Sequence, residues 1–255
     1  AVFETTSVKI DGGGYRFAVS ASRVKFDGYR SVYMSEDEVK VDSNTLVSSI
    51  DKDSVLTFRD FDYKQHLITH IFVTHAHGDH YGDAVEISKE KKAPIYTIFE
   101  LANHAIKSKA YAVGTNLGGE LNFEFGSLKF LNAQHSSSLD DGSYGGCPCS
   151  LLININGKKI LHLGDTALHS DMELYGNIYK PDIVLCPIGG FYTMGIDDAL
   201  IAAEILKPRF IIPMHYNTFE AIKADAYDFQ AKINKLNNIK CIVMDINSEI
   251  DIEKL

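Results

Sequence analysis

One stretch constrains this chain more than any other: Thr74-His75-Ala76-His77-Gly78-Asp79-His80. Three histidines and one aspartate fall within six residues, directly after the apolar run Ile71-Phe72-Val73. A short apolar run of this kind is typical of a buried strand. A strand that ends in such a cluster delivers several metal-binding side chains to one point, and we expect further ligands of the same site later in the chain.

The spacing inside this stretch sets conditions on its local geometry. His75 and His77 are two residues apart, and a fully extended backbone would point their side chains to opposite faces. They converge only if the chain turns, and we expect Gly78 to permit that turn. Asp79 and His80 then enter the next element, where the start of a helix would aim them at the same centre. Imidazoles and carboxylates suit zinc, and also iron or manganese, and their density favours a two-metal site.

Three further ligand-type residues stand at the ends of predicted strands. His135, Asp165 and His215 each come within two residues of the end of an apolar run. Taken alone, His135 and Asp165 would be assigned to a turn or a helix cap, and His215 to a hydrogen-bonded strand end. Taken together with the histidine-rich stretch, they are all ligand-type residues at strand ends, which indicates one shared metal site.

From residue 67 onward, predicted strands and helices alternate, which indicates an α/β fold. Predicted strands cover 71–74, 95–99, 183–187, 210–214 and 239–244, predicted helices cover 84–89, 100–109, 197–206 and 220–236, and predicted hairpins centre on 126–127 and 156–157. Asp197 is predicted to cap its helix. Upstream, 15–20 and 55–58 have the pattern of strands, and a hairpin turn is expected at Asp27-Gly28 within 23–33. Residues 60–67 resemble a linker.

The ligand-type residues, in their order along the chain, resemble the ligand set of the metallo-β-lactamase superfamily. They are His75, His77, Asp79, His80, His135, Asp165 and His215. The segments 132–138, 142–149, 164–167 and 187–195 are similar to a small bacterial and archaeal branch of metal-dependent hydrolases, which is itself similar to the ascorbate-phosphate lactonases. The resemblance covers residues 67–250 and implies a metallo-β-lactamase-like four-layer αββα sandwich.

This resemblance also implies roles for the ligands. His75, His77 and His135 would hold one divalent metal ion, Asp79, His80 and His215 would hold a second, and Asp165 would bridge them. Zn²⁺ is the expected metal, with Mn²⁺ or Fe²⁺ as alternatives. A metal-bridging hydroxide would attack a small-molecule ester, lactone or phosphorylated substrate, and Asp79 would orient it or transfer a proton as the catalytic residue.

The first 65 residues contain no comparable ligand cluster. The segments 15–29 and 55–66 resemble part of the β-rich gate of bacterial type IA DNA topoisomerases, with an ordinary β-meander as the alternative. We therefore divide the chain into residues 1–65, a β-rich topoisomerase-like segment that replaces the usual first strands, and residues 66–255, a metallo-β-lactamase-like hydrolase domain. The chain would then be a chimera. Either the upstream strands fill the gap in the first sheet, or an exposed edge lowers stability and activity.

Charge and composition narrow the range of partners. The formal net charge is −9, which disfavours nucleic acid and anionic membranes. Apolar runs fall short of a membrane span, which needs about 20 residues, and we expect no signal peptide. The four cysteines form no CxxC pair, so we expect a reducing cytoplasm. A small-molecule substrate is expected, and a homo-oligomeric state is left open.

Two other functions remain as alternatives. One is a metal-dependent nuclease of the same superfamily, which the acidic charge and the lack of a long insert between Asp165 and His215 disfavour. The other is a non-catalytic DNA-associated module that uses residues 1–65. Five histidines are expected to have surface or core roles, namely His66, His70, His104, His162 and His169. Two loops could line the site, one with Cys147 and Cys149 and one at 189–192; the second could equally be a tight connection.

Overall fold

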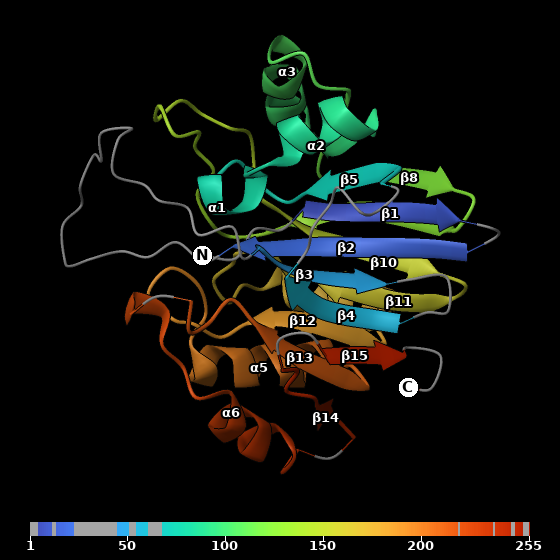
Figure 1. Ribbon diagram of the computed structural model, residues 1–255. Helices are drawn as coiled ribbons and strands as arrows, with labels where there is room; N and C mark the ends of the chain where they lie inside the picture. The colour runs from blue at the N-terminus through green and yellow to red at the C-terminus, as the bar shows by residue number, and fades with distance from the viewer. Residues whose placement is uncertain are drawn as a thin grey trace.

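The structure, a computed structural model, describes residues 5–11, 14–22, 45–50, 55–60, 68–218, 220–236, 238–245, 248–251 and 255. Figure 1 shows β-sheets in the middle of the molecule with helices at both ends of the view. The α-helices are α1 (Gly78–Tyr81), α2 (Ala84–Lys91), α3 (Phe99–Lys107), α4 (Asp171–Leu174), α5 (Ile196–Leu206) and α6 (Ala226–Ile233). A π-helical segment, η2 (Tyr175–Tyr179), follows α4, and a 3₁₀ turn, η3 (Glu220–Ile222), precedes α6.

The first sheet has eight strands in the order β15-β4-β3-β2-β1-β5-β6-β7. Its strands are β1 (Thr5–Asp11), β2 (Gly14–Ser22), β3 (Thr45–Ile50), β4 (Val55–Asp60), β5 (His70–Val73), β6 (Ile95–Ile98), β7 (Ala112–Thr115) and β15 (Ser248–Asp251). β1 pairs antiparallel with β5, so the position beside β5 is filled by an upstream strand. Of the two expected outcomes, the first therefore holds: the upstream strands fill the gap in the first sheet and leave no exposed edge at β5. The predicted hairpin at 23–33 and the linker-like residues 61–67 lie outside the described residues.

The second sheet has seven strands in the order β14-β13-β12-β11-β10-β9-β8. They are β8 (Glu120–Phe123), β9 (Gly126–Asn132), β10 (Cys149–Ile155), β11 (Lys158–His162), β12 (Ile183–Pro187), β13 (Phe210–Met214) and β14 (Lys240–Cys241). The predicted hairpin at 156–157 is confirmed, since Asn156 (φ 49°) and Gly157 (φ 87°) join β10 to β11. Two residues with positive φ match the twist of the strands that they connect.

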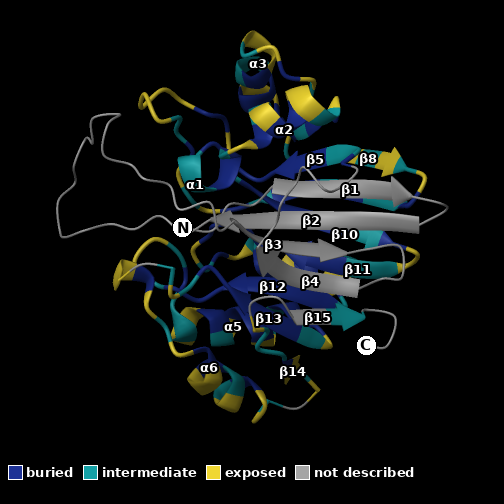
Figure 2. Cartoon of the chain, in the orientation of Figure 1, coloured by how far each residue is buried: buried dark blue, intermediate teal, exposed yellow. Residues whose placement is uncertain are grey.

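Three apolar layers hold the sheets and helices together. Along β12, Ile183 and Leu185 belong to the core shared by both sheets, whereas Val184 and Cys186 belong to the core beneath α4, α5 and α6. This alternation is the period-two pattern of a strand that is buried on both faces. A third core joins β5 and β6 to α2 and α3. Figure 2 shows buried residues along strands such as β12 and exposed residues on the outer sides of the helices. The predicted α/β class and αββα layering are confirmed.

The predicted long helix over 220–236 is wrong, because the chain forms η3 and α6 with a break between them. Asp225 produces the second start: its side chain accepts hydrogen bonds from the backbone N–H groups of Tyr227 (2.9 Å) and Asp228 (3.1 Å). An aspartate in this position satisfies N–H groups that have no partner within the helix. The apolar spacing of 220–236 thus indicates that η3 and α6 each bury one side, and it does not indicate one continuous helix.

Two smaller predictions also need correction. The N-cap of α5 is Gly195, which makes no side-chain cap, and Asp197 lies in the first turn, where a negative charge still suits the helix dipole. The last predicted strand, 239–244, is reduced to β14. Among the described residues, no helix combines the length and the apolar character that crossing a membrane requires.

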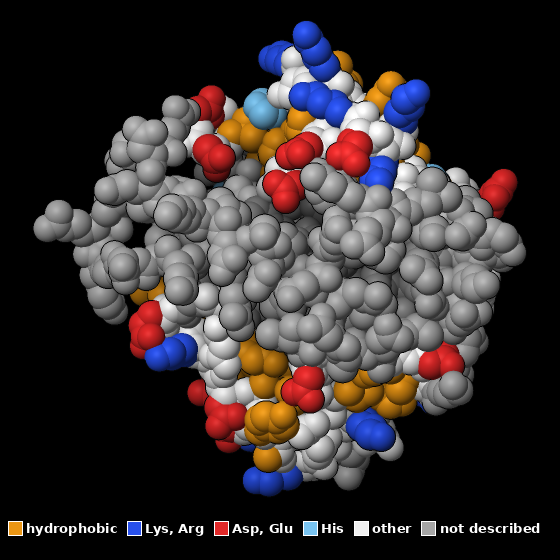
Figure 3. Space-filling view, in the orientation of Figure 1, with side chains coloured by type: hydrophobic (Ala, Val, Ile, Leu, Met, Phe, Trp, Pro, Cys, Tyr) orange, Lys and Arg blue, Asp and Glu red, His pale blue; other side chains and the backbone are white. Residues whose placement is uncertain are grey.

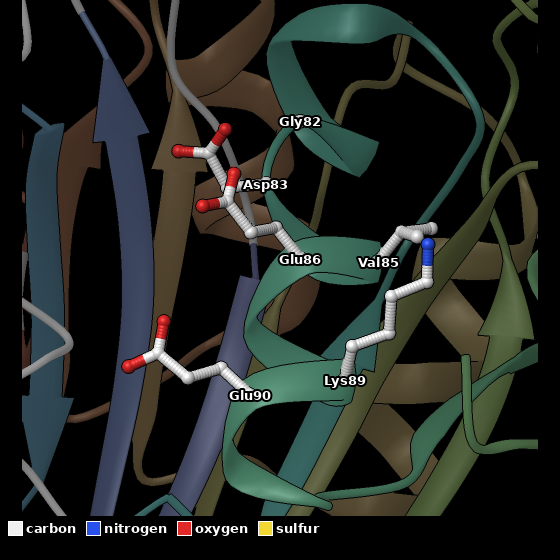
Figure 4. A pocket seen from close by; sticks show the side chains of 6 residues that line it. All are labelled: Gly82, Asp83, Val85, Glu86, Lys89 and Glu90. Carbon is white, nitrogen blue, oxygen red and sulfur yellow. The ribbon is translucent and has the colours of Figure 1, made fainter. Parts of the chain in front are cut away.

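A shallow hollow lies beside α2 (Figure 4). It is lined by Gly82, Asp83, Val85, Glu86, Lys89 and Glu90. None of the predicted metal ligands lines this hollow. Burial, together with the neighbouring charge of Glu86, raises the pKa of Asp83 above its ordinary value. The hollow therefore has no part in the chemistry considered below.

Candidate metal centre

The predicted ligands lie at strand ends that share one edge of the fold. β9 and β11 are both antiparallel to β10, and β11, β12 and β13 are mutually parallel, so β9, β11 and β13 run in one direction. His135, Asp165 and His215 follow these three strands. His75 follows β5, whose end meets α1 in Figure 1, and α1 carries Asp79 and His80. Residues far apart in the sequence are thereby brought to one place.

A first ligand group consists of His75, His77 and His135. Their ligand atoms all lie within 4.8 Å of one another. The Nε2 atom of His75 is 3.0 Å from the Nδ1 atom of His77. The ring centroid of His135 lies 5.2 Å from that of His75 and 5.0 Å from that of His77. Three converging imidazoles are a donor set that is typical of zinc.

A second ligand group consists of Asp79, His80 and His215, whose ligand atoms also lie within 4.8 Å of one another. The Oδ2 atom of Asp79 is 3.5 Å from Nε2 of His80 and 3.9 Å from Nε2 of His215. The two imidazole rings stack with an interplanar angle of 13°. This group offers one carboxylate and two imidazoles, all from residues that are buried or partly buried.

Asp165 lies between the two groups. Its Oδ2 atom is 3.5 Å from Nε2 of His135 in the first group. The same atom is 3.3 Å from Nε2 of His80 and 3.1 Å from Nε2 of His215 in the second. Within the described part of the chain, its Oδ1 atom is buried and has no hydrogen-bond partner. This carboxylate is therefore placed to contact both groups at once.

The first group has the protonation state that metal binding needs. Burial lowers the pKa of His75 well below its ordinary value, and burial also lowers the pKa of His77 and of His135. A buried imidazole loses the hydration that would stabilise its charged form. At neutral pH these three side chains are therefore neutral, and each has a nitrogen lone pair available for a metal ion.

The second group has the opposite electrostatic character. Burial alone would raise the pKa of Asp165, but His215 and His80 hold it well below its ordinary value. Burial alone would lower the pKa of His80, but Asp165 and Asp79 hold it well above its ordinary value. The pKa of His215 is raised for the same reason. Without a metal ion, protons on these imidazoles balance the carboxylates, and a divalent cation would take over that role.

Hydroxyl groups around the site orient two of the imidazoles. The Oγ1 atom of Thr74 lies 3.0 Å from Nδ1 of His75, and the Oγ atom of Ser136 lies 3.3 Å from Nε2 of His77. A hydrogen bond to one ring nitrogen leaves the other as the donor to a metal. The remaining nitrogen is Nε2 in His75 and Nδ1 in His77, and these two atoms face each other within the first group. The sequence analysis assigned no role to these hydroxyls; the serine run directly after His135 was the available signal.

Ser137 fixes the backbone between the two leading histidines. Its Oγ atom accepts a hydrogen bond from the backbone N–H of Ala76 at 3.1 Å, and both residues are buried. We expect Ser137→Ala to lower the free energy of unfolding by about 1–3 kcal/mol, because a buried N–H loses its partner. We also expect metal binding to weaken by roughly 10- to 100-fold. Thermal unfolding and zinc titration calorimetry measure the two effects.

Ser143→Ala is the matched control for this prediction. The Ser143 hydroxyl also makes a hydrogen bond, to Asp141 at 2.6 Å, but both side chains are exposed. We expect a change in stability of less than about 0.5 kcal/mol and unchanged metal affinity. Equal effects of the two substitutions would show that the contact from Ser137 to Ala76 does not organise the ligands.

Gly78 has a different role from the one predicted. His77 itself has extended backbone angles (φ −58°, ψ 144°), and Gly78 begins α1 without the positive φ that would require glycine. Glycine leaves room there for the side chain of Asp140, since a Cβ atom would lie 2.7 Å from its Oδ1 atom and that carboxylate would have to move. Gly145 has a similar role, since a Cβ atom would overlap the methyl group of Ala76.

The histidines that were predicted not to be ligands are outside the candidate ligand groups among the described residues. His70 stacks with aromatic rings, His104 lies 3.4 Å from the hydroxyl of Tyr81, His162 accepts a hydrogen bond from the N–H of Gly164, and His169 lies 3.9 Å from Asp171. His66 lies outside the described residues. No candidate group in the described ranges contains a cysteine. Cys149 instead donates from Sγ to the carbonyl of Thr74 at 2.9 Å.

Residues 57–216 match the family model of the beta-lactamase superfamily domain. The chain belongs to the metallo-β-lactamase superfamily. A metal-dependent hydrolase of Thermus thermophilus is 50% identical over 159 residues, which cover 62% of this chain and 70% of the relative. A metal-dependent hydrolase of Natranaerobius thermophilus is 34% identical over 223 residues, which cover 88% of this chain and 96% of the relative.

A solved structure extends the likeness to the fold. The metallo hydrolase from Ignicoccus hospitalis superposes with a TM-score of 0.69 at 28% identity, covering 96% of this chain and 97% of the other. The prediction of a metal-dependent hydrolase of this superfamily is therefore confirmed. The comparisons lend no support to the topoisomerase resemblance of residues 1–65 or to the lactonase-like branch. The chimera and the division at residue 65 stay predictions.

Proposed function

We propose that this superfamily member is a dinuclear metal-dependent hydrolase that acts on a small-molecule ester, lactone or phosphorylated compound. The observation that carries the proposal is the position of Asp165, since one oxygen atom lies within 3.5 Å of imidazoles from both ligand groups. A single-metal site needs no such carboxylate between two sets of three donors. Two cations a few ångströms apart, by contrast, are commonly bridged by one side chain.

The chemistry of the donors fits divalent cations. Oδ1 of Asp165 is buried without a hydrogen-bond partner among the described residues, and a buried polar atom left in that state costs about 1–3 kcal/mol. Coordination would remove this cost. Imidazole-rich donors with carboxylates favour Zn²⁺, and Mn²⁺ or Fe²⁺ also accept such ligands. The free cysteines, three of them buried, are compatible with a reducing compartment such as the cytoplasm.

Bound cations and the Asp79 carboxylate would have different roles in hydrolysis. Bound divalent cations would supply a nucleophile from water at neutral pH and stabilise negative charge that develops on the substrate. Asp79 has a side chain that is 27% exposed, against 3% for Asp165, so it is the more accessible carboxylate. Burial alone would raise the pKa of Asp79, but His80 keeps it below its ordinary value. Asp79 is therefore ionised and can accept a proton or orient water.

Metal content and turnover test this proposal directly. The purified chain, reconstituted with Zn²⁺ or Mn²⁺, should hold two ions per chain by elemental analysis. Its hydrolysis of 4-nitrophenyl acetate should disappear after dialysis against a chelator and return when the metal is restored, because the donor groups form the site. Binding of a single ion, or turnover that survives complete metal removal, would contradict the dinuclear proposal.

A further inference from the structure

Three large aromatic side chains are exposed on loops that adjoin the metal centre. Tyr144 is 66% exposed, Phe191 is 73% exposed and Tyr192 is 53% exposed. They stand on two separate loops, and each loop contacts a ligand-bearing segment. Exposed apolar side chains are common singly, but a set gathered around one site marks a surface that binds something.

The loop that carries Tyr144 packs on the first ligand group. The N–H of Gly145 donates to the carbonyl of Ser137 at 3.0 Å. Gly145 also lies so close to Ala76 that only glycine fits there. Because Ala76 stands between His75 and His77, Tyr144 is one residue from a contact with the ligand segment itself.

The loop that carries Phe191 and Tyr192 packs on the second group and on Asp165. Gly189 lies against the backbone carbonyl of His215. The N–H of Met194 donates to the carbonyl of Thr166, the residue after Asp165, at 3.0 Å. The loop follows β12, whose end points to the same side as the end of β5 in Figure 1. Both ends of this short loop are thus fixed to ligand-bearing segments.

The backbone of Phe191 is itself unusual. Its φ is 49°, a left-handed conformation that a bulky residue adopts rarely and only under strain. Its ring meets that of Tyr192 edge to face, with centroids 4.7 Å apart. A strained backbone that holds an exposed aromatic pair beside a metal centre is a feature of ligand-contacting loops, whereas a simple connection needs neither the strain nor the aromatic rings.

Within the part of the chain that the structure describes, the segments that carry the ligands and the two aromatic loops contain no positively charged lysine or arginine. The described segments 74–88, 130–148, 163–179, 188–206 and 214–218 include every predicted ligand and not one lysine or arginine. They do include acidic residues, among them Asp140, whose charge acts on His77. On the face drawn in Figure 3, Lys and Arg side chains gather instead over α2 and α3. Apart from bound cations and the ligand imidazoles, these segments offer a phosphate group no positively charged partner, and their carboxylates would repel it.

We propose that the substrate is an uncharged ester or lactone with an aromatic group, which Tyr144, Phe191 and Tyr192 hold against the metal centre. This proposal rests on the proposed hydrolase function and selects among its substrate classes. The scissile acyl C–O bond lies over the ligand groups while the ring contacts the aromatic side chains. The oxygen of water bonds to the carbonyl carbon, the acyl C–O bond breaks, and the released oxygen takes up a proton.

Two probes with the same ring but different charge test the substrate class. Dihydrocoumarin is a neutral aryl lactone, and phenyl phosphate is an aryl phosphomonoester. Once the chain is shown to hold two metal ions, we expect kcat/KM to be at least about 100-fold higher for dihydrocoumarin than for phenyl phosphate. The reason is that the described segments around the ligands supply no lysine or arginine to pair with the phosphate group. Equal or faster turnover of phenyl phosphate, or no hydrolysis of dihydrocoumarin by the metal-loaded chain, overturns the proposal.

Hydroxamates test the aromatic contacts without turnover. Acetohydroxamic acid and phenylacetohydroxamic acid present the same metal-chelating group and differ by one phenyl ring. By titration calorimetry, the aromatic compound should bind roughly five- to tenfold more tightly. Phe191→Ala and Tyr144→Ala should each reduce this difference in affinity between the two hydroxamates. In the turnover assay, each substitution should mainly raise KM for dihydrocoumarin. Tyr227→Ala should leave both quantities unchanged, since Tyr227 is equally exposed, at 63%, on α6.

The outcomes separate the two proposals. If the chain holds two metal ions and binds both hydroxamates equally, the aromatic contacts are wrong and the hydrolase function stands. If it binds neither metal ion nor hydroxamate, the hydrolase function itself fails. If Tyr227→Ala reduces the aromatic advantage as much as Phe191→Ala does, the ring does not sit on the proposed loops.

Discussion

Asp165→Asn is expected to reduce the bound metal from two ions to at most one per chain and to lower kcat/KM by on the order of 10³-fold. Asparagine has the size and shape of aspartate, so the packing at this fully buried position is preserved. The substitution removes one negative charge and replaces one acceptor oxygen by an NH₂ group. The effect therefore reports the charge and the coordinating capacity of this side chain, not its volume.

The geometry explains why this effect should exceed that of losing any one histidine. Each imidazole belongs to one group, but Oδ2 of Asp165 lies 3.1 Å from His215, 3.3 Å from His80 and 3.5 Å from His135. If each group held a cation, the two cations would repel each other, and the Asp165 carboxylate would supply negative charge that offsets this repulsion. Without that carboxylate, the second ion would lose both a ligand and its electrostatic support.

Elemental analysis and zinc titration calorimetry check the stoichiometry, and turnover of 4-nitrophenyl acetate checks kcat/KM. Asp197→Asn is the matched control, since it makes the same chemical change on α5 in a side chain that is 93% exposed. It should leave both quantities unchanged. Two ions bound to Asp165→Asn with wild-type affinity would show that the carboxylate does not bridge the groups.

The position of Asp165 was predictable from sequence because its signal is local. A buried strand of apolar residues ends in Gly164-Asp165, and the order of ligand types along the chain resembles that of a known superfamily. Strand ends also determine where His135 and His215 lie. For these residues the fold adds distances, and their assignment as metal ligands stays a prediction.

Other parts of the site depend on contacts that no local pattern encodes. Ser137 meets Ala76 across 61 residues of sequence, and Gly78 avoids the side chain of Asp140, which lies 62 positions further along the chain. A serine run or a glycine in a loop has many local uses, so its real partner appears only in three dimensions. The break at Asp225 was missed for a related reason, since apolar periodicity continues across a gap when two short helices share one buried face.

The pairing of β1 with β5 was likewise open at the level of sequence. The residues of 1–65 indicated strands, and the resemblance of the later chain indicated a missing neighbour for β5. Nothing in either pattern specifies which strand pairs with which, because backbone hydrogen bonds are the same for every sequence. The structure places Ser7 opposite Ile71 in an antiparallel register.

Gly189→Ala is expected to weaken the second metal site by at least about tenfold and to lower the free energy of unfolding by about 1–3 kcal/mol. Gly189 follows β12 and lies against the residue that follows β13. A methyl group here would overlap the backbone carbonyl of His215 and would lie 2.8 Å from Cβ of Ile222. A backbone atom cannot rotate away as a flexible side chain can, so the His215 segment must shift.

His215 tolerates such a shift poorly. Its φ is 55°, a left-handed conformation that only the surrounding contacts maintain. The hydrogen bond from the N–H of Ile188 to the carbonyl of Met214, at 3.1 Å, ties the two segments together just before Gly189. A displacement of a few tenths of an ångström at Gly189 therefore moves the imidazole of His215, whereas the first ligand group, held by β5 and β9, stays in place.

The measurement is a two-site zinc titration together with thermal unfolding of the metal-loaded chain. Gly195→Ala is the control from the same loop, because its added methyl group would meet nothing closer than Cα of Gly190 at 3.8 Å and its φ of −86° suits alanine. Gly189→Ala should lose affinity selectively at the second site. Equal loss at both sites would indicate general unfolding of the centre, and no loss at either would show that the contact of Gly189 with His215 does not position this ligand.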